Sequence, residues 1–87
     1  MIKRMYHKMR ILSWEESYKK AGGLLDAGRK QEAYRLMQKL AYAGYVTAQT
    51  GLGVMYDAGI GVEKNPDKAV KWYRRAAKKG NQGHSVL

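Results

Sequence analysis

Apolar residues recur along this chain every three or four positions, which is the spacing of one face of an α-helix. The stretch around residues 33–41 is a clear example, and the basic and polar residues between the apolar positions complete an amphipathic pattern. The chain is therefore predicted to fold as an all-α protein. The residues that share this first apolar face are Ala33, Leu36, Met37, Leu40 and Ala41.

The N-terminal third of the chain predicts two helices. Residues 1–12 are basic and rich in Met, and they predict a short helix that packs on or caps the fold, with a disordered basic arm as the alternative. Ser13 is followed by Glu16 three residues later, which is the capping-box pattern at the start of a helix. This second helix is predicted to end near Gly28, because Gly readily adopts the left-handed conformation that follows a helix.

Three more helices are predicted after Gly28. The third is expected to end at Gly44, and the fourth covers about residues 47–58. The fifth begins at Asn65-Pro66-Asp67, where a side-chain cap precedes a proline and an acid in the first turn. Its predicted end is Gly80.

An internal repeat organises these helices into pairs. Residues 17–28 (SYKKAGGLLDAG) align with residues 48–59 (AQTGLGVMYDAG), and Gly44 corresponds to Gly80 in the second halves. The sequence therefore predicts two stacked antiparallel helix hairpins, at residues 13–45 and 46–80. Residues 81–87 are predicted to form either an irregular cap or the start of a further unit.

The second hairpin resembles the Sel-one-like repeat family, a branch of the tetratricopeptide superfamily. The first hairpin turns more tightly at Gly28 and has Leu36-Met37 where the second has Trp72-Tyr73, so it is more similar to a plain tetratricopeptide hairpin. The resemblance implies a right-handed α-solenoid that acts as a non-catalytic adaptor for other proteins, often in bacterial signalling, envelope or host-contact settings. The positions that carry it are Ala48, Leu52-Gly53, Tyr56, Gly59, Gly61-Val62, Asp67, Ala69, Trp72-Tyr73, Ala76-Ala77 and Gly80.

Charge and composition narrow the class of partner. The 87 residues contain 17 Lys and Arg but 7 Asp and Glu, giving a net charge of +10. This favours an acidic partner, whether a protein, a nucleic acid or an anionic membrane surface. The chain has no Cys, which excludes disulfides and thiolate metal sites. It has neither a signal-peptide pattern nor a run of about 18 apolar residues, so a cytoplasmic protein without a membrane span is predicted.

Two sets of candidate binding residues follow. The resemblance implies a groove lined by the first helix of each hairpin, and Tyr18, Tyr45 and Gln49 are the candidates there. A basic set is spaced i, i+3, i+4 and i+7, which places its members on one helix face. This face is interpreted as a phosphate or carboxylate contact surface, or else as a solvated outer face. Its members are Lys71, Arg74, Arg75 and Lys78.

No catalytic or metal-binding set is found in the sequence. His7 and His84 are far apart and have no third ligand, so no metal or cofactor is expected. Glu15 and Glu16 are adjacent and diverge on a helix, so they cannot form an acid–base pair. The predicted function is an adaptor that binds an acidic protein or peptide. The alternatives are a small nucleic-acid-associated protein, a structural subunit of a larger repeat assembly, and a homodimer through the open ends of the stack.

Overall fold

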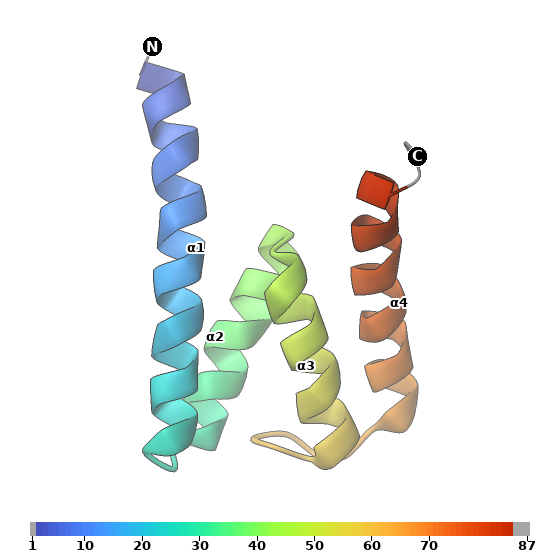
Figure 1. Cartoon of the computed structure of the whole chain (residues 1–87). Coiled ribbons are helices and arrows are strands. Elements are labelled where there is room, and N and C mark those ends of the chain that lie inside the picture. Colours follow the sequence, from blue (N-terminus) through green and yellow to red (C-terminus); the bar gives the residue numbers. More distant parts are fainter. Residues whose placement is uncertain (1, 85–87) are drawn as a thin grey trace.

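The computed structural model describes the backbone of residues 2–84 and the side chains of residues 13–80. Four helices and no strand occur in this part of the chain, which confirms the all-α helical-repeat fold (Figure 1). They pair as two antiparallel hairpins, with the start of α1 and the end of α4 on the same side of the molecule. The helices are α1 (Ile2–Asp26), α2 (Lys30–Ala43), α3 (Val46–Ala58) and α4 (Pro66–His84).

Local sequence signals set most of the helix ends. The helices α1, α2 and α3 are each followed by a glycine with positive φ, at Gly28, Gly44 and Gly59. At the end of α2, the amide of Gly44 donates to the carbonyl of Ala41 at 3.1 Å, which satisfies one of the helix's last acceptors. The predicted start of α4 is confirmed, because Oδ1 of Asn65 accepts a hydrogen bond from the amide of Lys68 at 3.1 Å.

Two predicted helix ends are wrong. Ser13 lies inside α1, which continues from Ile2 to Asp26, so the predicted first and second helices are one helix. Gly80 likewise lies inside α4, which extends to His84. Gly80 has no positive φ, and a Cβ atom built on it would meet nothing within 4 Å. In this protein a glycine therefore ends a helix only where its backbone adopts a positive φ.

The packing around α3 depends on two glycines. Successive residues of a helix are about 100° apart, so Gly51 and Gly53 lie on nearly opposite sides of α3. A Cβ on Gly51 would lie 3.0 Å from Sδ of Met37 in α2, and one on Gly53 would lie 2.6 Å from Cε1 of Tyr73 in α4. The absence of side chains thus lets α2 and α4 both approach α3 closely, and α3 becomes the central helix.

The core is a thin layer of apolar side chains around α3. The molecule measures 42 × 32 × 16 Å along its principal axes, so it is a flat slab. The turn between α3 and α4 also contributes to the core, because Val62 packs against it as predicted. The Met side chains of residues 1–12 were predicted to cap one open end of the stack, and the end near Val86 and Leu87 was predicted to pair with a second copy or another protein. These side chains lie outside the described residues. The largest buried core residues are Met37, Leu40, Leu52, Met55, Tyr56 and Trp72.

Candidate functional site

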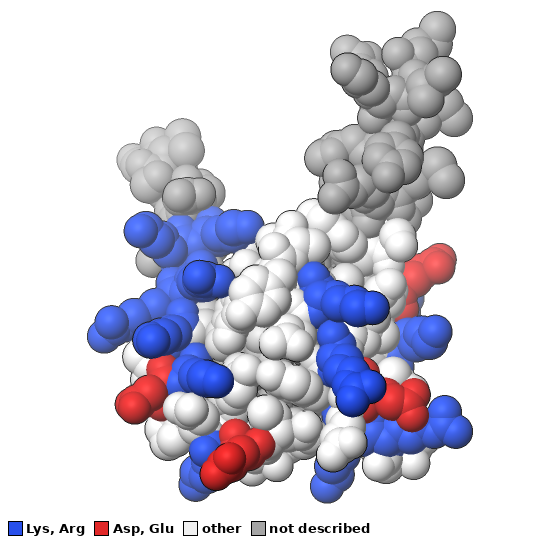
Figure 2. Space-filling view, turned by 180° about the vertical axis from the view of Figure 1, so that it is seen from behind, with Lys and Arg blue, Asp and Glu red and all other residues white. Residues whose placement is uncertain are grey.

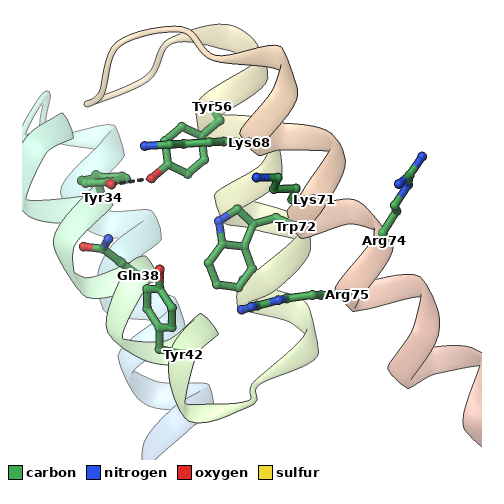
Figure 3. Close-up of a pocket in the computed structure, with 9 residues that line it drawn as sticks. All are labelled: Tyr34, Gln38, Tyr42, Tyr56, Lys68, Lys71, Trp72, Arg74 and Arg75. Atoms are coloured by element: carbon green, nitrogen blue, oxygen red, sulfur yellow. Dashed lines mark hydrogen bonds between the residues drawn. The ribbon is translucent and has the colours of Figure 1, made fainter.

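A pocket lies between α2 and α4, with the end of α3 contributing to it (Figure 3). Its volume is about 540 Å³, which is within the range of pockets that bind ligands or peptide side chains. It is lined mainly by the second helix of each hairpin, whereas the first helices were expected to line the groove. The lining residues are Tyr34, Gln38, Tyr42, Tyr56, Lys68, Lys71, Trp72, Arg74 and Arg75.

Four aromatic side chains form two edge-to-face pairs in this pocket. The rings of Tyr42 and Trp72 are 5.0 Å apart at an interplanar angle of 83°. The rings of Tyr34 and Tyr56 are 5.8 Å apart at 84°, and their hydroxyl oxygens form a hydrogen bond of 2.7 Å. Each pair joins α2 to the second hairpin, so the pocket walls are fixed by aromatic packing across the two repeats.

Two cations lie against these aromatic rings. The Nζ atom of Lys68 is 5.5 Å from the ring centre of Tyr56, and the guanidinium carbon of Arg75 is 4.9 Å from that of Trp72. Both distances are within the range of a cation–π interaction. Packing against a ring face does not use the N–H groups of Lys68 and Arg75 as hydrogen-bond donors. These groups therefore stay available to bind an anion.

No carboxylate lines this pocket. All seven acidic side chains fall within residues 13–80, and the ion pair found among those residues joins Arg29 to Glu32 at 3.9 Å, away from the pocket. Lys and Arg side chains gather along the side of the molecule formed by α4, next to an uncharged strip (Figure 2). The pocket therefore has a positive rim without an internal counter-charge.

The Tyr34 hydroxyl is held in its neutral form. Burial and, to a lesser extent, the hydrogen bond with Tyr56 together raise the pKa of Tyr34 from 10.0 to about 12. The positive charge of Lys68 acts the opposite way and lowers this pKa. At neutral pH Tyr34 thus presents a hydroxyl group to this end of the pocket rather than a phenolate.

Tyr18 and Tyr45 lie together, away from this pocket. Their rings are 5.9 Å apart and Tyr45 is also 5.8 Å from Trp14, so the three rings join α1 to the start of α3. Tyr18 and Tyr45 are half-buried in this cluster and pack against the core. Their role in binding a partner stays a prediction.

Gln49 is buried between α2 and α3. Its Nε2 donates to the carbonyl of Ala41 at 3.1 Å, while its Oε1 is buried and has no hydrogen-bond partner among the described residues. The carbonyl of Ala41 can only accept, which fixes the orientation of the amide. Gln49 also lines a smaller neighbouring pocket of about 380 Å³. Its proposed contact with a partner is likewise untested.

The predicted basic face is divided between the two pockets. Lys71, Arg74 and Arg75 line the large pocket, and Arg75 and Lys78 line the smaller one. The Arg74 side chain extends away from the other labelled residues in Figure 3. The face therefore borders the space between α2 and α4 rather than lying wholly on an outer surface.

The predicted binding residues include none on the α2 side of the pocket. Tyr34, Gln38 and Tyr42 are spaced i, i+4 and i+8, which places them on one stripe of α2 beside its apolar face. Their spacing was a usable signal. It could not reveal that this stripe faces α4, because that depends on how closely α2 and α4 approach α3.

No metal or membrane site is found in the described part of the chain. Residues 13–80 contain no group of three His, Asp or Glu side chains placed to hold a metal ion. The side chains of His7 and His84 lie outside this range. Within the described residues, none of the helices has the length and apolar character needed to cross a membrane.

Comparison with known proteins agrees with the helical repeats. The Sel1 repeat family model matches residues 23–45 and 46–81. Chitin synthase regulatory factor 3 of Schizosaccharomyces pombe is 44% identical over 50 residues, covering 58% of this chain. Chitin synthase regulator SKT5 of Saccharomyces cerevisiae is 36% identical over 58 residues, covering 67% of it. A putative sel1-like repeat-containing protein, R815 of Acanthamoeba polyphaga mimivirus, is 42% identical over 45 residues, covering 52%.

The matched segments are small parts of these relatives. They make up 5% of the S. pombe protein and 8% of each of the other two. No solved structure matches the chain significantly. Sel1 repeats generally mediate protein–protein interactions. The two family-model matches together cover more than half of the chain, and the chain therefore belongs to the Sel1 repeat family.

Proposed function

We propose that this chain is a non-catalytic interaction module that binds an acidic segment of a partner protein in the pocket between α2 and α4. The observation that carries the proposal is the pocket's positive rim, where Lys68, Lys71 and Arg75 surround aromatic side chains and no carboxylate is present. An acidic peptide supplies the missing counter-charges, and its apolar side chains cover the aromatic rings.

The family and the relatives support a role in protein interaction. Two relatives are named as chitin synthase regulators, and we propose that this chain similarly holds a protein partner rather than transforming a substrate. A cytoplasmic setting is part of the same proposal, since the absence of Cys suits a reducing compartment.

A nucleic-acid partner is the rival that the net charge of +10 favours. The peptide is preferred because Lys68, Lys71 and Arg75 lie around one pocket lined by aromatic side chains. A nucleic acid would be contacted along its backbone by a longer run of cations, and its affinity would fall steeply with salt.

Fluorescence anisotropy with a labelled acidic peptide of about ten residues tests the proposal directly. We expect a dissociation constant in the micromolar range, roughly that of a small interface, and no binding of the same peptide with Lys in place of each acid. Arg75→Glu is expected to weaken binding by at least about tenfold, because it places a carboxylate next to the ligand's own.

The matched control is Lys19→Glu. Lys19 is exposed on α1 and lines none of the pockets described above, so it changes the net charge equally without touching the site. Circular dichroism checks that both variants fold. Equal losses in the two variants would show a response to net charge alone and overturn the proposed pocket. Preferential binding of an RNA or DNA oligomer of equal charge would favour the nucleic-acid function instead.

A further inference from the structure

One end of the pocket is an array of hydrogen-bond donors. One of the Tyr34 and Tyr56 hydroxyls donates to the other in their 2.7 Å hydrogen bond. The hydroxyl that accepts still has its own proton, which it can donate to a ligand. The ammonium group of Lys68 lies over the ring of Tyr56, close to this pair. A neutral hydroxyl beside a cation is a favourable environment for a carboxylate oxygen.

The other end presents flat apolar surface. The ring of Trp72 is buried, but Tyr42, which packs edge-to-face against it, is 66% exposed. The Arg75 guanidinium stacks on Trp72 on the same side of the pocket (Figure 3). An exposed tyrosine next to a planar guanidinium offers two flat surfaces to an incoming aromatic ring.

We infer that the pocket has two subsites and recognises an acidic residue close in sequence to an aromatic residue of the partner. The carboxylate is held by the Tyr34–Tyr56 hydroxyls and Lys68, and the aromatic side chain packs on Tyr42 and Arg75. This inference rests on the proposed function and specifies the segment that the pocket selects. Both subsites belong to one cavity of about 540 Å³, so the two anchors must come from neighbouring residues of the bound segment.

The anion at the first subsite is a carboxylate rather than a phosphate. The cations that line the pocket nearest this end are Lys68 and Lys71, whose ammonium groups act as point charges. Arg75 is stacked on Trp72 at the opposite end, whereas phosphopeptide sites are usually built from Arg clusters that bind the phosphate with several donors.

A set of peptides with equal length and net charge separates the two subsites. The reference peptide contains Glu next to Trp within an acidic segment flanked by Gly residues. Its variants carry Leu for Trp, Gln for that Glu with a compensating acid elsewhere, or the flanking Gly residues moved between the Glu and the Trp. We expect each variant to bind about tenfold more weakly than the reference, as loss of one aromatic or charged anchor implies.

Protein variants assign each anchor to its subsite. Tyr42→Ala is expected to weaken the reference peptide about tenfold while hardly changing the peptide with Leu for Trp. Lys68→Gln is expected to weaken binding of the reference peptide while hardly changing binding of the peptide with Gln for Glu. Tyr42 is exposed and Lys68 lies at the surface, so both variants should fold, and circular dichroism verifies this.

The outcomes distinguish the inference from the function on which it rests. Equal binding of all the acidic peptides, with or without the aromatic residue, would overturn the two subsites and leave the proposed function intact. Failure of every acidic peptide to bind would overturn both. Binding of a phosphoserine peptide more than about tenfold tighter than the Glu peptide would overturn the choice of carboxylate.

Discussion

The two glycines of α3 face neighbours of different stiffness. Gly53 packs against the aromatic ring of Tyr73 and Gly51 against the flexible side chain of Met37. A methyl group at position 53 would lie 2.6 and 2.8 Å from two ring carbons, so the ring or the helix must move. At position 51 the nearest atom, at 3.0 Å, is the sulfur of a side chain that can adopt another rotamer.

Gly53→Ala is therefore expected to destabilise the protein by about 1–3 kcal/mol through overpacking. Gly51→Ala should change stability much less, because the higher helix propensity of Ala offsets the smaller clash with Met37. The free energy of unfolding, from urea denaturation of both variants, measures the difference. A cost at Gly51 equal to that at Gly53 would contradict this account of how α4 packs.

The Tyr34 hydroxyl links stability to alkaline pH. Its pKa is about 12 in the folded protein against 10.0 when exposed, so the folded state favours the neutral form. The contribution to stability is complete below pH 10 and is lost as the pH rises from 10 through 12. Tyrosinate absorbance should show a group with a midpoint near pH 12 that is missing in Tyr34→Phe. Tyr56→Phe should lower that midpoint by removing the hydrogen bond, and an unchanged titration would count against the Tyr34–Tyr56 contact.

Local sequence determines the positions of some helix ends in this protein but not of others. Asn65 caps α4 through a contact three residues away, and Gly28 and Gly44 end α1 and α2, so nearby residues suffice to predict them. Ser13 carries an equally good capping pattern, but the backbone before it is already helical. A capping side chain acts only at a residue that leaves the helical conformation, and the pattern alone cannot tell whether it does.

The N-cap of α4 gives a direct test of this local contribution. Asn65→Ala removes the hydrogen bond to the amide of Lys68 and is expected to cost about 1 kcal/mol. Asn65→Asp keeps an acceptor and adds a negative charge at the helix's positive end, so it should be as stable as Asn65 or more so. Thermal denaturation compares the two variants with the original protein, and an Asn65→Ala variant of unchanged stability would show that the cap contributes nothing.

The pocket itself could be predicted only in part. Its α4 side was visible as the spacing of Lys71, Arg74 and Arg75, and the fold followed from the repeat pattern. The α2 side needed the three-dimensional arrangement, because Tyr34 and Tyr42 face α4 only when the glycines of α3 let both helices close on it. Sequence spacing reports which residues share a helix face, but not which other helix lies opposite.

The charge of the whole molecule should make its stability depend on salt. The chain has 17 basic and 7 acidic side chains, and the structure shows one ion pair among residues 13–80, so we expect repulsion among cations to dominate the surface electrostatics. Salt screens this repulsion over about 10 Å at 0.1 M. We therefore expect the midpoint of thermal unfolding to rise as salt is added, whereas a protein stabilised by surface ion pairs would lose stability.

Lys78→Glu tests the repulsion among cations at one position of the basic face. Arg74 and Lys78 are four residues apart on α4 and repel each other, and the substitution converts them into an opposite-charge pair. We expect a gain of about 0.5 kcal/mol at low salt that fades as salt approaches roughly 1 M. Lys78→Gln, which removes the repulsion without adding attraction, should give a smaller gain. Because Lys78 does not line the large pocket, its substitution should also leave the binding of an acidic peptide there largely unchanged. A variant that loses stability at low salt would show that the basic face is held by contacts other than those described.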